Sequence, residues 1–383
     1  MKENEVKNAA EESLKPRDLA QIRDFIARSS TVDERLANSK IDSTMTINEI
    51  DQLQTYEVVV VGCGGWGLAV LKVLQEMGIN ALGLERGEIC HNLTTYMPAM
   101  TVHSPLPYII LDPADPLLAQ QGDDYHSTIE ELIQSYVNFA EKYKLPIKTH
   151  STLSDIQGQQ GNFVISVREK DDNTRYKAKL VVLATGAYDK PNLLGIPGEQ
   201  APTVHHYFAE WQHIHNQRLL FIGGGFSSAD GITALCPFNE VLWVTNKPLD
   251  AIEQTLHDQK TKWGQPDAKL LNTEILPESK VYSLADKIAL IQTPDGERQW
   301  LFDQCFMLLG HRPDEPLLQR VLGDDTSHDE STFESKTKPG IYLVGALAKK
   351  HLEHIGLTDK LCPGNEGVRH IDNVINAIKN QLI

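Results

Sequence analysis

The pattern of apolar and polar positions predicts strands and helices that alternate along most of the chain. Short apolar runs, typical of strands buried on both faces of a parallel sheet, occur at Val58–Val61, Leu180–Leu183, Arg218–Ile222, Val241–Val244 and Gly340–Gly345. Apolar residues recur at helical spacing in Ile129–Tyr143, and again in Asn365–Leu382 at the end of the chain. We therefore expect an α/β protein.

Weaker patterns predict the elements between these runs. Strands of a small sheet or meander are expected at Ile147–Thr149, Phe163–Val167 and Tyr176–Lys179. Further strands are expected around Val281, Ile288–Gln292 and Trp300–Phe302. Ala251–Asp267 is polar and compatible with a helix.

The stretch Tyr56–Arg86 reads as a complete strand, glycine turn, helix and second strand. Its turn has the pattern G-x-G-x-x-G, made of Gly62, Cys63, Gly64, Gly65, Trp66 and Gly67. The apolar side of the helix that follows is predicted to be Leu68, Leu71, Val73, Leu74 and Met77. The second strand, Asn80–Leu84, ends at Glu85 and Arg86.

Each part of this unit suits a dinucleotide. Gly62 permits a tight turn, Gly64 lets the backbone approach a pyrophosphate, and Gly67 lets the helix pack against the strand. The helix N-terminus offers unpaired N–H groups to phosphate, and Glu85 can accept hydrogen bonds from a ribose diol. The unit predicts a dinucleotide site, with an empty Rossmann-like domain as the alternative.

A second glycine turn follows the strand Arg218–Ile222. It consists of Gly223, Gly224 and Gly225 followed by Phe226, Ser227 and Ser228, with Ser228 at the third glycine position. The next strand ends at Thr245, Asn246 and Lys247. An acid at this tip favours NAD and arginines favour NADP, whereas here only Lys247 is present. A second nucleotide site is predicted, and a weak or disused one is the alternative.

Two further segments are candidates for the site. The irregular stretch after Arg86 is expected to wrap a cofactor, with its ring near Tyr96, Met97, Met100, His103 and Ser104. The strand Leu180–Leu183 ends in the turn Ala184, Thr185 and Gly186.

The order of these units predicts one domain inserted into another. Residues 56–196 and 303–383 are expected to form the first domain, and residues 197–302 the second. Cys305–Pro313 echoes the strand and turn Leu180–Gly186 and is expected to return the chain to the first domain. Residues 1–55 read as a polar extension with an amphipathic helix from Pro16 to Ala37, which packs on its own domain or makes a homodimer or partner contact.

Composition narrows the class of protein. The net charge of −16 argues against nucleic acid or an anionic membrane as the main partner. No apolar run approaches the length of a membrane span. The five cysteines and fourteen histidines show no metal-ligand spacing, so we expect no metal site and a reducing, cytoplasmic setting.

Two glycine turns, the ATG-type turns and a terminal strand–helix pair together resemble the two-dinucleotide-binding-domain flavoproteins. These include thioredoxin reductases, bacillithiol-disulfide-reductase-like proteins and flavin-containing monooxygenases. The resemblance implies two Rossmann-like, three-layer ββα domains, with an NAD(P)H domain inserted into an FAD domain. It implies that the first turn binds FAD and the second NADPH or NADH. Gly345, after the last strand, and Asn365 and Glu366, at the N-terminus of the last helix, are then expected near the flavin.

The chain departs from these families at three points. No CxxC motif is present, which argues against thioredoxin reductase activity. Bacillithiol-reductase-like proteins carry a cysteine before the last glycine of the first motif, where this chain has Trp66. Gly345 is followed by Ala346 rather than by the aspartate that holds the flavin ribityl chain in thioredoxin reductases.

Three functions remain open at this point. The first is a monooxygenase-like reaction, in which electrons pass from NAD(P)H through FAD to oxygen and a small-molecule substrate. The second is reduction of a small disulfide or other acceptor, with Cys63 and Cys362 as the candidate thiols. The third is a non-catalytic FAD-binding protein. His103 and His205 are the candidate catalytic groups, because histidine titrates near neutral pH.

Overall fold

The computed structural model describes residues 52–169, 172–209, 211, 213–263, 270–348 and 368–382. The chain divides into a unit of residues 1–52 and a unit of residues 53–383, and the structure described here belongs to the second. The expected helix Pro16–Ala37, its partner contact, and the candidates Cys362, Asn365 and Glu366 lie outside the described residues.

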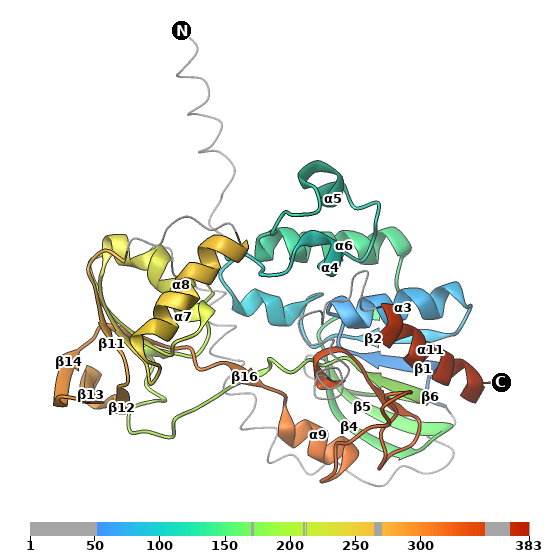
Figure 1. Ribbon diagram of the computed structural model, residues 1–383. Helices are drawn as coiled ribbons and strands as arrows, with labels where there is room; N and C mark the ends of the chain where they lie inside the picture. The colour runs from blue at the N-terminus through green and yellow to red at the C-terminus, as the bar shows by residue number, and fades with distance from the viewer. Residues whose placement is uncertain are drawn as a thin grey trace. The chain divides into compact units, whose positions relative to one another are not determined.

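A seven-stranded sheet forms the centre of the first half of this unit (Figure 1). Its parallel strands are β1 (Thr55–Val61), β2 (Ala81–Leu84), β3 (Ile147–Lys148), the end of β6 (Asp172–Leu183) and β17 (Ile341–Leu343). The start of β6 pairs antiparallel with β5 (Asn162–Glu169), which pairs with β4 (Ser151–Gln159). The two strands expected at 176–179 and 180–183 are therefore one, and β4 was not predicted.

Alternate residues of β1 separate two layers around this sheet. Val58 and Val60 face the core that holds α3 (Gly65–Glu76), α6 (Ile129–Tyr143) and α11 (Val368–Leu382). Val59 and Val61 face the core beneath the antiparallel meander and α9 (Glu315–Leu322). The result is helices, sheet and meander in three layers. Met77 is an exception to the predicted apolar face, because α3 ends at Glu76 and leaves Met77 exposed.

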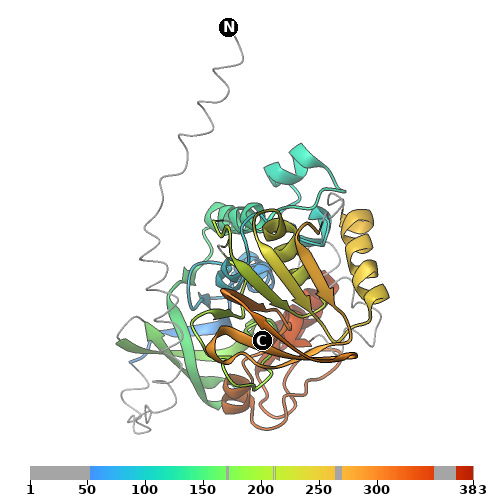
Figure 2. The same cartoon turned by 90° about the vertical axis from the view of Figure 1, so that its left-hand side faces the viewer.

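The second half repeats this plan. Its five-stranded parallel sheet has the order β11 (Thr273–Leu276), β10 (Glu240–Val244), β9 (Arg218–Ile222), β15 (Gln304–Met307) and β8 (Val204–His205). In Figure 2 the second half faces the viewer. One core contains α7 (Phe226–Leu235) and α8 (Leu249–Trp263), and the other contains β12 (Lys280–Ser283), β13 (Ile288–Thr293) and β14 (Gly296–Leu301).

The two halves are joined by a short antiparallel ribbon of β7 (Lys190–Pro191) and β16 (His311–Arg312). The segment Cys305–Pro313 was expected to return the chain to the first domain. Its first part, β15, pairs with β8 and β9 in the second sheet, and its last part contains β16, which pairs with β7 in the ribbon.

Short helical turns complete the described chain. They are η1 (His91–Thr95), α4 (Leu106–Ile109), α5 (Pro116–Gln121), η2 (Cys236–Phe238), η3 (Ala285–Lys287) and η4 (Gly345–Ala348). The α/β class predicted from the sequence is confirmed, with two three-layer units in one chain.

Candidate functional site

The first glycine turn is built by close backbone approach. Gly62 has φ 95°, and a Cβ there would lie 2.5 Å from the Ala184 carbonyl oxygen at the end of β6. A Cβ at Gly67 would lie 1.9 Å from the Gly62 carbonyl oxygen, so α3 packs directly on the turn. Gly64 precedes α3, and a Cβ there would meet nothing within 4 Å. The turn is thus closed on the protein side and open at Gly64, as a bound pyrophosphate requires.

Glu85 closes this turn from the tip of β2. Its side chain is buried, and its Oε2 accepts a hydrogen bond from the Cys63 backbone N–H at 2.8 Å. Burial raises the pKa of the Glu85 carboxyl, against the opposing effect of backbone N–H donors and of the Arg86 charge. The carboxylate therefore stands beside the turn, where a ribose would lie.

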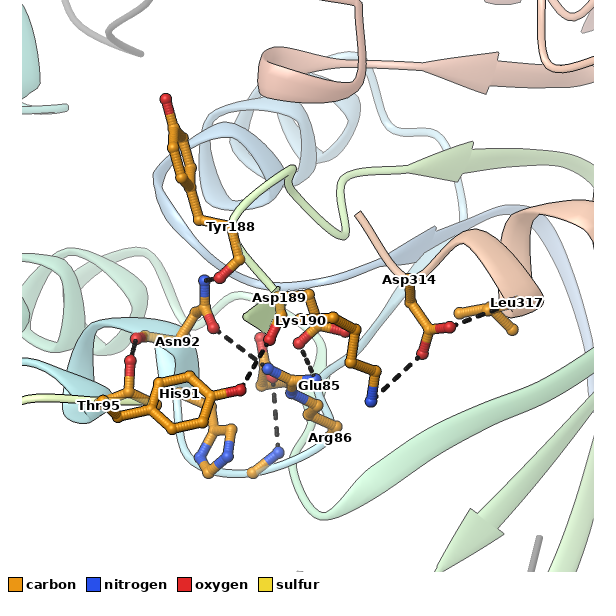
Figure 3. A network of polar contacts seen from close by, with 12 residues as sticks. Glu85, Arg86, His91, Asn92, Thr95, Tyr188, Asp189, Lys190, Asp314 and Leu317 are labelled. Atoms are coloured by element: carbon orange, nitrogen blue, oxygen red, sulfur yellow. Dashed lines mark hydrogen bonds and ion pairs between the residues drawn. The ribbon is translucent and has the colours of Figure 1, made fainter. Parts of the chain in front are cut away.

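The Arg86 side chain contacts other protein groups and does not extend into open space. Its guanidinium forms an ion pair with the buried Asp189 and donates from Nη2 to Asn92 Oδ1 at 3.2 Å (Figure 3). The Asn92 amide then donates to the Tyr188 carbonyl at 2.7 Å, and the Tyr207 hydroxyl donates to the Asp189 carbonyl at 3.0 Å. This network links the tip of β2 to the segment that leads into the second half. No motif in the sequence indicated this network.

The second glycine turn repeats the first. Gly223 has φ 125°, and a Cβ there would lie 2.4 Å from the Leu308 carbonyl oxygen. Gly225 precedes α7 and is open, while Ser228 is fully buried against Gly223 in the place of a third glycine. Lys247 Nζ donates to the Gly224 carbonyl at 2.9 Å. The residues of this turn, with Phe226 and Ser227 as the first of α7, fit a second dinucleotide.

Two residues of the segment expected to wrap a cofactor ring pack into the core of the second half. Met97 and Met100 are 7% and 8% exposed, in one cluster with Phe208 and Phe221. Tyr96 makes an isolated parallel bridge to Phe208. The apolar side chains of Met97 and Met100 explain this placement, because burying a methionine side chain typically stabilises a protein by roughly 2 kcal/mol.

His103 and His205 occupy different surroundings. His103, followed by Ser104, lies edge-on to Phe226 with ring centroids 5.0 Å apart. The His205 Nε2 lies 2.8 Å from Gln304 Oε1, and its ring stacks at a tilt 4.2 Å from Trp211. Burial lowers the pKa of His205. These contacts give His205 a structural place on β8, and its predicted catalytic role stays a prediction.

Gly345 and the turn after β6 flank the first glycine turn. Gly345 has φ 66°, and a Cβ there would lie 2.6 Å from the Trp66 ring. Its N–H donates to His370 Nε2 at 3.0 Å, and the His370 ring lies edge-on to Trp66 at 5.1 Å. Gly186, after Ala184 and Thr185, has φ 77° and open space beside it.

The described cysteines are sealed in the protein. Cys63, Cys90, Cys236 and Cys305 are free and buried, and burial raises the pKa of each thiol. Within the described ranges, no group of His, Cys, Asp and Glu could hold a metal ion. In the same part of the chain, no helix has the length and apolar character needed to cross a membrane.

Comparison with known proteins confirms the resemblance drawn from the motifs. Residues 59–345 match the family model for pyridine nucleotide-disulphide oxidoreductases. The bacilliredoxin reductase Bdr of Bacillus subtilis is 25% identical over 313 residues, which cover 76% of this chain and 90% of that protein.

Solved structures show the same fold. The bacillithiol disulfide reductase Bdr from Bacillus cereus aligns with a TM-score of 0.71 and 20% identity, over 86% of this chain and 100% of that one. A flavin-containing monooxygenase from Stenotrophomonas maltophilia aligns with a TM-score of 0.62 and 19% identity, over 86% and 99%. At these identities the structural likeness establishes the fold alone.

Proposed function

The chain belongs to the pyridine nucleotide-disulphide oxidoreductase family, and from this premise we propose that it passes electrons from NAD(P)H through FAD directly to a small acceptor, in a monooxygenase-like reaction with oxygen. The protein is an oxidoreductase that uses FAD and NAD(P)H. When bound, the flavin supplies the redox chemistry, accepting hydride from the nicotinamide and giving electrons to the acceptor.

The two glycine turns divide the cofactors between them. In this proposal Gly62–Gly67 and Glu85 hold FAD, with the open face of Gly64 toward its pyrophosphate. Gly223–Ser228 and the N-terminus of α7 hold NAD(P)H in the same manner. Fit at both turns supports this division, because each is closed by backbone contact on one side and open at the glycine that precedes its helix.

Burial of the thiols is the observation that supports direct electron transfer from the flavin to the acceptor. A thiol relay needs an accessible sulfur with a lowered pKa. Cys63, beside the first turn, is 0% exposed, and burial together with Glu85 raises its pKa well above the usual value. Trp66 stands where a relay cysteine would be, and its ring packs on Gly345 and His370. Without a relay among the described residues, the acceptor must meet the flavin itself.

A second candidate is an NAD(P)H-dependent reductase of a small disulfide. The likeness to bacilliredoxin reductase Bdr, which extends over 90% of that protein, favours it. Such a reaction would draw on Cys362, the one cysteine outside the described residues.

Anaerobic stopped-flow spectroscopy tests the proposal. The purified flavoprotein is mixed with NADPH and, separately, NADH, and flavin absorbance is followed before and after air is admitted. We expect bleaching by one nucleotide and rapid return of colour with air, unchanged in Cys362→Ser. Slow reoxidation by air, but rapid reoxidation by a small disulfide that Cys362→Ser abolishes, would favour the second candidate. A flavin that neither nucleotide reduces would contradict both and leave a non-catalytic flavoprotein.

A further inference from the structure

An acidic side chain lies close to the helix that is proposed to receive NAD(P)H. Asp230 is on the second turn of α7, four residues after Phe226, the first residue of the helix. Its carboxylate is 8% exposed and accepts a hydrogen bond from Gln259 Nε2 at 2.5 Å. The N-terminus of α7 has no side-chain cap, so its first N–H groups are available to a phosphate. A negative charge one turn away opposes the binding of a pyrophosphate there.

His103 brings a compensating group to this place from the other half of the molecule. Its Nε2 lies 3.8 Å from Asp230 Oδ2, and its ring lies edge-on to Phe226 at 5.0 Å. Residues four apart share one face of a helix, so both contacts fall on the same side of α7. Met97 and Met100, buried in the second core, anchor the segment that carries His103.

We propose that His103 is a positioning residue of the NAD(P)H site: it reaches from the FAD half to α7 and, when its ring is protonated, offsets the charge of Asp230, and so permits the dinucleotide pyrophosphate to bind at the helix N-terminus. This inference rests on the proposed role of the second glycine turn. Both halves then contribute to the dinucleotide site, because the net charge near the N-terminus of α7 depends on a segment that precedes the second sheet in the chain.

Nucleotide binding without turnover tests the inference. NADP⁺ and, in parallel, NAD⁺ are titrated into the FAD-loaded protein by calorimetry, and flavin content and thermal melting confirm that each variant is folded. For His103→Gln we expect the dissociation constant of the preferred nucleotide to rise about tenfold, which corresponds to the loss of one favourable charge interaction of about 1.4 kcal/mol. His103→Lys introduces a permanent positive charge at this position and is expected to stay within about threefold of the parent.

The effect of His103→Gln is then measured again in protein that also carries Asp230→Asn. Once the acid is neutral, there is no charge to offset, so His103→Gln should change affinity by less than about twofold in the double variant. His215→Gln, a histidine at the opposite end of β9 that packs on Phe238, is the matched control and should bind as the parent does.

The outcomes separate this inference from the proposed function. If the parent binds nucleotide and His103→Gln binds equally well, the inference is wrong and the proposed function stands. If His103→Gln loses the same factor with and without Asp230, His103 does not act by offsetting that charge, and the inference is again wrong. If the parent binds neither nucleotide and its flavin is not reduced, the proposed role of the second turn fails.

Discussion

Two glycines of the first turn should respond in opposite ways to the same substitution. Gly67 and Gly64 both lie in the G-x-G-x-x-G pattern, but their surroundings differ. A Cβ at Gly67 would lie 1.9 Å from the Gly62 carbonyl oxygen, whereas a Cβ at Gly64 would meet nothing within 4 Å. Gly67→Ala should therefore destabilise the protein, whereas Gly64→Ala should leave the protein folded and weaken what binds in the open space.

The structure gives the size of each effect. Real Cβ contacts do not fall below 3.0 Å, so alanine at Gly67 forces the turn and α3 apart by about 1.1 Å, from 3.0 minus 1.9. Overpacking of this kind typically costs about 1–3 kcal/mol of the free energy of unfolding. Gly64 has φ −78° and ψ −174°, which alanine adopts freely, so Gly64→Ala should stabilise the protein by about 0.5 kcal/mol.

Flavin-stripped protein and FAD titration separate the two effects. Urea unfolding of the stripped variants measures the free energy of unfolding, and quenching of FAD fluorescence measures the dissociation constant. For Gly64→Ala we expect unchanged or slightly raised stability with FAD binding weakened about a hundredfold or more, since a methyl group would hold the pyrophosphate off the backbone. If Gly64→Ala bound FAD as the parent does, the open face of the first turn would not be where the pyrophosphate lies.

Three further effects follow from the structure. Burial and the Arg86 charge lower the pKa of His91 to about 4, so between this value and the ordinary pKa of about 6.5 the unfolded chain binds a proton that the folded protein does not. The free energy of unfolding should therefore fall by on the order of 2–3 kcal/mol as the pH drops from about 6.5 to 4. Urea titrations of His91→Gln should lose this pH dependence. Arg86→Met leaves Asp189 buried and unpaired and should cost about 1–3 kcal/mol in the same assay, partly restored by adding Asp189→Asn; equal stability of both variants and the parent would contradict the role of the ion pair. Ellman's reagent should label the thiols of Cys63, Cys90, Cys236 and Cys305 only after the protein is unfolded. Fast labelling of any of these thiols in the native protein, located by peptide mass spectrometry, would refute their burial.

The elements that could be predicted are those whose signal is local. Ile129–Tyr143 was predicted with its observed bounds because its apolar spacing is helical, and the structure adds a capping box of Thr128 and Glu131 at its start. The glycine turns were found for the same reason, since each needs small residues at fixed spacing. Strand β4 was missed, because Ser151–Gln159 is mostly polar and buries little beyond Leu153 and Ile156.

Long-range placement could not be predicted. Nothing near Arg86 in the sequence indicates that Asp189 is its partner, because the ion pair depends on how the segment after β6 returns past the tip of β2. Met97 and Met100 read only as apolar residues in an irregular stretch, and no period identifies the core that receives them. For His103 the sequence indicated a residue type suited to a site, whereas its neighbours Phe226 and Asp230 came from the fold.

Met97 and Met100 are buried in the core of the second half, so the second half depends on a segment that lies outside it in the sequence. A fragment cut at the ribbon would lack the two methionines and expose Phe208 and Phe221, so it should aggregate when expressed alone. During synthesis, the methionines leave the ribosome well before the strands that bury them. A chimera that exchanges the second half with a relative must therefore also exchange the segment of residues 96–103, which makes this stretch part of the evolutionary module despite its distance in the chain.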